Sequence, residues 1–227
     1  MANHLDLEEQ EQIDQLKHFW NTWGNLISSV LLLVFGSIAI WNGYQFWQNR
    51  QSMQAAALQE ELNAAIRAKD DAKLEQAFKD IRDKYASTQQ SVQAGLLASK
   101  AWQDNKNAAK SEEALLWVVQ SGADEGQKAI ARLRLAGLLL EKGAYDDALK
   151  QLSAPVPPEF EAIVADRQGD IRILQQKPAE ALEQYRKAHD KLGAYPEFKR
   201  LVAFKLNALG FNPDSTAVAS SDKGGPG

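Results

Sequence analysis

The chain has 227 residues, of which 44% are apolar and 25% are charged, and its formal net charge is -4. This composition allows one packed domain with accessory segments, and the near-neutral balance of interspersed charges excludes an electropositive face for nucleic acid. The absence of cysteine excludes disulfides, thiolate metal sites and thiol catalysis, and it leaves the redox compartment open.

Residues 1–22 form an acidic N-terminal tail. Its charged side chains give a local charge of -4: Asp6, Glu8, Glu9, Glu11, Asp14 and Lys17. We predict that this tail precedes a membrane anchor.

Residues 23–47 are predicted to form a transmembrane helix. The run from Phe19 to Asn49 contains no Asp, Glu, Lys or Arg in 31 residues, and as a helix it would be about 46 Å long, more than a bilayer core of about 30 Å. Aromatic side chains with a polar handle favour the headgroup level. We therefore predict membrane-interface positions at both ends of the run, for Trp20, Trp23, Trp41, Tyr44 and Trp47.

A buried core helix and a cleaved signal peptide are the alternatives to a retained anchor. Signal peptides begin with a basic segment, whereas this segment follows an acidic one and offers only Ser37-Ile38-Ala39 as a weak cleavage site. We favour the retained anchor. Basic residues near the two ends are too few for the positive-inside rule to choose an orientation, although a short N-terminal tail most often remains in the cytoplasm.

Residues 48–210 are predicted to form a helical domain. There is neither glycine nor proline between Gly43 and Gly95, apolar residues recur at helical spacing, and sustained period-two alternation is absent beyond Arg50. The predicted fold class is all-α: a single N-terminal transmembrane helix followed by a tetratricopeptide-like α-solenoid.

A repeat of about 34 residues supports the solenoid. Ala114, Ala148 and Ala181 are separated by 34 and 33 residues, which is the period of tetratricopeptide repeats. We predict repeat packing at these alanines and at Gly169 and Tyr185. An unrelated helical bundle is the alternative, because Trp102 stands where the repeat favours a small residue and Ala77 precedes Ala114 by 37 residues.

The repeat predicts about four helical hairpins over residues 52–191 and a closing helix after them. The expected apolar face of the closing helix comprises Phe198, Leu201, Val202, Lys205 and Leu209. Residues 211–227 show no apolar stripe, and we predict a disordered tail.

Candidate catalytic groups are scarce. The histidines are His4, His18 and His189, and we place His189 on a solvated helix face without a metal-ligating partner. The acidic pairs at residues 70–71, 112–113 and 146–147 are predicted to open helices, where negative charge complements the helix dipole. We expect no enzyme activity, no cofactor and no metal site.

The stretch "EAIVADRQGDIRILQQKPAEALEQYRKA", together with one N-terminal span and an acidic tail, resembles the YfgM family of ancillary SecYEG translocon subunits. The most specific residues are those from Ile163 to Asp166, with Gly169. The resemblance implies an inner-membrane protein with a cytoplasmic N-terminus and a periplasmic domain. The implied partners are the SecYEG translocon, a PpiD-like membrane-anchored chaperone and nascent exported chains, which the protein would help pass to periplasmic chaperones.

Stacked hairpins create a concave surface that can hold a peptide segment. The predicted function is therefore that of a membrane-anchored protein-interaction module. Two alternatives stay open at this point: a structural scaffold of an envelope complex that binds no client, and a regulator that acts through the cytoplasmic tail.

Overall fold

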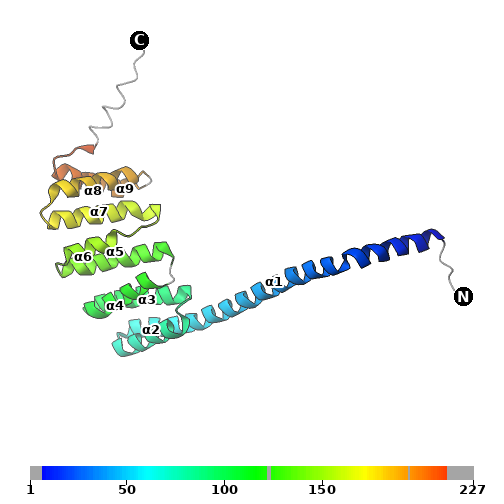
Figure 1. The fold of residues 1–227 in the computed structure, drawn as a ribbon. Helices are drawn as coiled ribbons and strands as arrows, with labels where there is room; N and C mark the ends of the chain where they lie inside the picture. Colours follow the sequence, from blue (N-terminus) through cyan, green and yellow to red (C-terminus); the bar gives the residue numbers. More distant parts are fainter. Residues whose placement is uncertain (1–6, 122–123, 194, 214–227) are drawn as a thin grey trace, which may run out of the picture. The chain divides into compact units, whose positions relative to one another are not determined.

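The computed structural model describes residues 7–121, 124–193 and 195–213, and these residues form helices and connecting turns without a strand (Figure 1). The all-α prediction is confirmed. The helices are α1 (Leu7–Ala68), α2 (Asp71–Tyr85), α3 (Gln89–Asp104), α4 (Ala108–Gln120), α5 (Glu125–Glu141), α6 (Tyr145–Leu152), α7 (Pro158–Leu174), α8 (Pro178–Lys191) and α9 (Pro196–Ala208). The chain divides into two units, residues 1–53 and 54–227. Most of the predicted C-terminal tail lies outside the described residues.

The first unit contains most of α1, which includes the predicted span. Among the described residues, α1 is the one helix long and apolar enough to cross a membrane. Three of its hydroxyls are satisfied within the helix: those of Thr22, Ser29 and Ser37 each donate a hydrogen bond to the carbonyl four residues earlier, at 2.7–2.9 Å. This matters in a bilayer core, because lipid offers polar groups no partner. Residues 7–22 belong to the same helix.

The second unit is built from hairpins that share one turn geometry. Each turn contains a residue with positive φ, and the next residue's N–H bonds to the carbonyl five positions earlier, which is the hydrogen-bond pattern of a Schellman helix end. The positive-φ residues are Lys69, Lys106, Gly143 and Gln176. Only one of the four is glycine, the residue that adopts positive φ without a steric cost. The repeat is therefore clearer in the backbone than in the sequence.

These turns reveal how the predicted alanines relate to one another. Ala148 and Ala181 each lie five residues after the positive-φ residue of their turn, and the residue at that position in α4 is Ser111. Ala114 lies eight residues after its turn residue, as Ala77 does. Ala77 and Ala114 thus occupy equivalent positions in their hairpins. Their spacing of 37 residues equals the spacing of the turn residues Lys69 and Lys106, so this repeat is longer.

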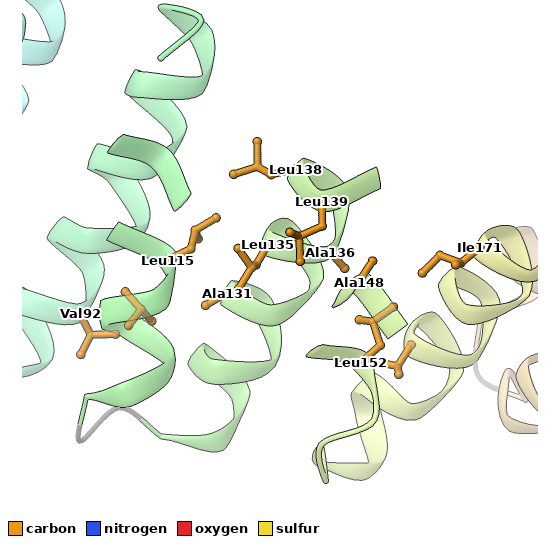
Figure 2. Close-up of a cluster of buried hydrophobic side chains, with 12 residues drawn as sticks. Val92, Leu115, Ala131, Leu135, Ala136, Leu138, Leu139, Ala148, Leu152 and Ile171 are labelled. Carbon is orange, nitrogen blue, oxygen red and sulfur yellow. The ribbon is translucent and has the colours of Figure 1, made fainter. Parts of the chain in front are cut away.

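Three buried clusters run along the stack. The first core lies between the end of α1 and α4, the central core joins α3 to α7, and the third core joins α7 to α9. Figure 2 shows the central core, in which Leu115 from α4, Leu135 from α5 and Leu152 from α6 contribute side chains to one continuous cluster. Each core is therefore shared by helices of consecutive hairpins.

Trp102 is buried in the first core, with only 3% of its surface exposed. Its ring meets that of Phe78 edge to face at 5.7 Å, and Phe78 meets Trp117 in the same manner at 5.6 Å. Such edge-to-face contacts are favourable beyond the area that they bury. An aromatic cluster thus fills this core at the position where the repeat favours a small residue.

Two of the three acidic pairs open helices as expected. Asp70 caps α2 by accepting a hydrogen bond from the Lys73 N–H, and the pair at residues 146–147 lies in the first turn of α6. The prediction for residues 112–113 is wrong, because Asn107 caps α4 and the pair lies a turn further along the helix. Glu112 instead pairs with Lys142, the residue that follows α5, and Glu113 pairs with Arg82 of α2 at 3.1 Å.

Candidate functional site

An apolar groove of about 400 Å³ lies where α5, α7 and α9 meet. We call it the α5–α7–α9 groove. The helices contribute Ile130, Leu133 and Arg134 from α5, Phe160, Ala162 and Ile163 from α7, and Tyr195 and Phe198 from the start of α9, with Leu192 between α8 and α9. These residues come from parts of the chain that are brought together only by the stacking of the hairpins.

The groove combines an open apolar surface with a charged rim. Ile163 and Tyr195 remain 37% and 60% exposed. The guanidinium of Arg134 donates a hydrogen bond to the Leu96 carbonyl at 2.9 Å, which ties α5 to α3 beside the groove. On the other side, Lys191 pairs with Glu161, and this hydrogen bond holds the pKa of the Glu161 carboxyl below its usual value. Such a surface suits an apolar segment flanked by polar residues.

A partly buried polar network links α9 to α7. The Lys205 ammonium donates to Asp166 and to Asp170, both at 2.7 Å, and the Tyr185 hydroxyl donates to Asp170 at 2.8 Å. Asp166 is only 6% exposed. Because α9 supplies Tyr195 and Phe198 to the groove, this network fixes the position of one of its walls.

Burial sets the protonation preferences of the network. Burial raises the pKa of Asp166, and the hydrogen bond from Lys205 opposes this effect. Burial also raises the pKa of the Tyr185 phenol, and the adjacent Asp170 carboxylate adds to that increase. The phenol therefore keeps its proton and remains a hydrogen-bond donor to Asp170.

The predicted repeat-packing residues lie inside the stack and not in the groove. Ala114, Ala148 and Ala181 are each 0% exposed. A Cβ atom on Gly169 would lie 2.5 Å from a ring carbon of Tyr185, so α7 and α8 approach each other too closely there for any side chain. Gly95 has the same role in α3, because its Cβ would lie 2.7 Å from a methyl group of Val118.

The five predicted interface aromatics all lie on α1, in the first unit. Trp20, Trp23, Trp41, Tyr44 and Trp47 are each more than half exposed. The ring centroids of Tyr44 and Trp47 lie 6.2 Å apart. Their position on the helix leaves them free to meet lipid, and the interface assignment stays a prediction.

Sequence reasoning missed the groove itself. The sequence singled out Ile163 only as part of the family resemblance, and it did not single out Tyr195. Their size and apolarity give no distinctive signal, because α7 and α9 expose other large apolar side chains, such as Leu174 and Phe204. His189 also differs from expectation, because its side chain is largely buried, at 14% exposure, with its Nδ1 3.8 Å from Asp190. No group of three or more potential metal ligands occurs in the described part of the chain.

Comparisons with known proteins agree with this architecture. The tetratricopeptide repeat-like domain family matches residues 17–211. The ancillary SecYEG translocon subunit of Neisseria gonorrhoeae is 30% identical over 214 residues, which cover 92% of this chain and 100% of that protein. The proteins of the same name from Aggregatibacter actinomycetemcomitans and Escherichia coli are 25% and 23% identical, over 89% and 88% of this chain and 98% and 96% of their own lengths. The chain therefore belongs to the YfgM family of ancillary SecYEG translocon subunits, with a tetratricopeptide repeat-like domain.

Proposed function

We propose that this protein is a membrane-anchored interaction subunit of the SecYEG translocon, and that its α5–α7–α9 groove binds an apolar segment of a partner protein. The relatives' name supports the association with the translocon. The observation that carries the binding proposal is the groove, because it leaves large apolar side chains such as Ile163 and Tyr195 open at its surface. Exposed apolar surface in a concave site is typical of protein recognition.

The family and the apolar segment of α1 fit a single-pass protein of the inner membrane. The proposed domains are the acidic cytoplasmic tail at residues 1–22, the membrane helix at 23–47, the periplasmic domain at 48–210 and the C-terminal tail at 211–227. Trp20 and Trp23 then mark the cytoplasmic interface, and Trp41, Tyr44 and Trp47 mark the periplasmic one.

Reporter fusions test the orientation. Alkaline phosphatase, which is active only in the periplasm, is expected to be active when fused after Gly210 and inactive when fused at Asn3. Green fluorescent protein exported by the general secretory route fails to fluoresce, so it should report the opposite pattern. Phosphatase activity at Asn3 with none after Gly210 would reverse the topology.

The proposed role in export follows from the anchor. A tether at the translocon raises the local concentration of the groove near emerging chains, so weak contacts suffice for binding. We infer that the groove receives nascent exported chains or a PpiD-like membrane-anchored chaperone, and that it helps pass exported proteins to periplasmic chaperones. A scaffold would instead hold envelope components together without contacting a client.

Substitution in the groove tests this function. Ile163→Asp is expected to weaken binding of the partner by about tenfold or more, because a carboxylate would replace an apolar contact surface. The measurement is the amount of translocon subunit, chaperone and exported chain that co-purifies from detergent with the full-length protein. Leu174→Asp is the matched control, since Leu174 is an exposed leucine of the same helix outside the groove.

Crosslinking separates the proposed role from a scaffold. A photocrosslinking residue at Ile163 is expected to capture newly exported chains or a chaperone, whereas the same residue at Leu174 should not. Capture of translocon subunits alone, at both positions, would indicate a scaffold. Equal co-purification with the Ile163→Asp and wild-type proteins would contradict the assignment of the groove.

A further inference from the structure

A second cavity, separate from the α5–α7–α9 groove, lies at the C-terminal end of the stack. This terminal pocket has a volume of about 430 Å³, and its walls include Arg186, His189 and Asp190 from α8, Lys199 and Leu206 from α9, and Phe211 beyond α9. Its size is in the range of ligand-binding cavities. None of its residues belongs to the groove.

Two cations of the terminal pocket have no carboxylate partner. Neither Arg186 nor Lys199 lies within 4.0 Å of an acidic side chain among the described residues. By contrast, Lys191 pairs with Glu161, and Lys205 pairs with two aspartates. The one acid of the pocket, Asp190, has an 80% exposed side chain. Among the described residues, the pocket therefore carries a net positive charge that no carboxylate within 4.0 Å balances.

The guanidinium of Arg186 is held in place by an aromatic ring. It lies 4.6 Å from the centroid of the Phe211 ring, a distance at which a cation is attracted to the ring face. The position of Phe211 is itself fixed, because Gly210 adopts φ +79° and the Phe211 N–H bonds to the Leu206 carbonyl at 3.0 Å. Stacking leaves the N–H edges of the guanidinium available to a planar acceptor.

We propose that the terminal pocket binds carboxylate side chains of an acidic segment in a partner protein. A carboxylate matches the planar fork of Arg186 with two parallel hydrogen bonds, and Lys199 supplies a second positive charge. The apolar surfaces of Leu206 and Phe211 suit the methylene groups of a glutamate side chain. This proposal does not rest on the function proposed for the groove.

Fluorescence anisotropy with a labelled hexaglutamate peptide and the full-length protein in detergent micelles tests the proposal. Hexaglutamate is expected to bind about tenfold or more tightly than the neutral hexaglutamine peptide, and salt should weaken its binding because exposed charges are screened. The protein that carries both Arg186→Gln and Lys199→Gln should bind hexaglutamate about tenfold more weakly than the wild type does.

Control variants separate the pocket from general surface charge. The combination of Lys187→Gln and Arg200→Gln removes the same charge from α8 and α9 outside the pocket, and Ile163→Asp alters only the groove; both should bind hexaglutamate as the wild type does. Asp190→Asn should tighten binding about threefold, because it removes the negative charge of the pocket. A loss of folding cannot produce such a gain.

Three results would overturn the proposal. The first is unchanged hexaglutamate binding in the protein that carries both Arg186→Gln and Lys199→Gln. The second is equal binding of hexaglutamine. The third is displacement of the peptide by inorganic phosphate but not by acetate at matched ionic strength, which would assign the pocket to phosphate groups instead.

Discussion

The combined substitutions Leu31→Arg and Val34→Arg are expected to abolish membrane retention. Both residues lie in the middle of the uncharged run of α1, and both are exposed on the helix surface. An arginine at the centre of a membrane helix raises the apparent free energy of insertion by about 2.5–3.5 kcal/mol, so two cost about 5–7 kcal/mol. The protein should then appear in the aqueous fraction after carbonate washing, and a phosphatase fused after Gly210 should lose its activity.

Ile13→Arg with Leu16→Arg is the matched control. These residues are exposed apolar positions of the same helix, but they lie before the uncharged run, where an arginine would face water or headgroups. This variant should remain in the membrane pellet. If the wild-type protein itself were soluble after carbonate washing, or if its mature N-terminus lay downstream of Ala39, a retained anchor would be ruled out.

Gly169→Ala is expected to destabilise the helical domain by about 2 kcal/mol, whereas Gly137→Ala should stabilise it by about 1 kcal/mol. The added Cβ at Gly169 would overlap the buried Tyr185 ring, and overpacking of this kind costs about 1–3 kcal/mol. A cost of about 3 kcal/mol, reduced by the gain of about 1 kcal/mol that alanine brings in helix propensity, gives the expected net loss. At Gly137, in α5, the new Cβ would meet no atom within 4 Å, so only the higher helix propensity of alanine acts. The two variants should therefore differ by about 3 kcal/mol.

Urea unfolding of the full-length protein in detergent micelles, followed by far-UV circular dichroism, measures this difference. Equal stabilities of the two variants would mean that the Tyr185 ring can move aside without cost. The close approach of α7 and α8 at Gly169 would then be permissive and not a requirement of the repeat.

The sequence was most informative where a pattern depends on local spacing. The uncharged run of α1 and the helical periodicity of residues 48–210 predicted the all-α architecture, because the period of apolar residues follows the geometry of a single helix. Helix starts could be predicted where Asp70 provides a cap. The start of α4 was not predicted correctly, because Asn107 is its cap and the pair at residues 112–113 lies inside the helix.

The closing helix shows where local periodicity stops being sufficient. Its expected apolar face included Leu201, yet Leu201 is half exposed, while Val202 and Leu206 are fully buried. Lys205 was assigned to the same face, and its ammonium instead enters a polar network with two aspartates of α7. Which positions of α9 are buried depends on the angle at which it meets α7 and α8, and this angle is not encoded in the spacing of α9 alone.

The turns and the groove could not be predicted from the sequence for a related reason. Lys69, Lys106 and Gln176 adopt positive φ, although their residue types rarely do, so three of the four turns carried no glycine signal. The groove requires α5, α7 and α9 to stack side by side, and none of these helices alone marks Tyr195 or Ile163 as open to solvent. Both features are products of tertiary packing.

The link between Lys205 and Asp166 limits how this array can change during evolution. Solenoids usually gain or lose terminal units easily, since each unit contacts only its neighbours. Here, a lysine lost from α9 while the helix remains packed would leave the buried Asp166 carboxylate without its cation, which is strongly unfavourable. Helices α7, α8 and α9 should therefore be inherited as one indivisible module, and recombination between relatives should preserve the aspartate and the lysine together.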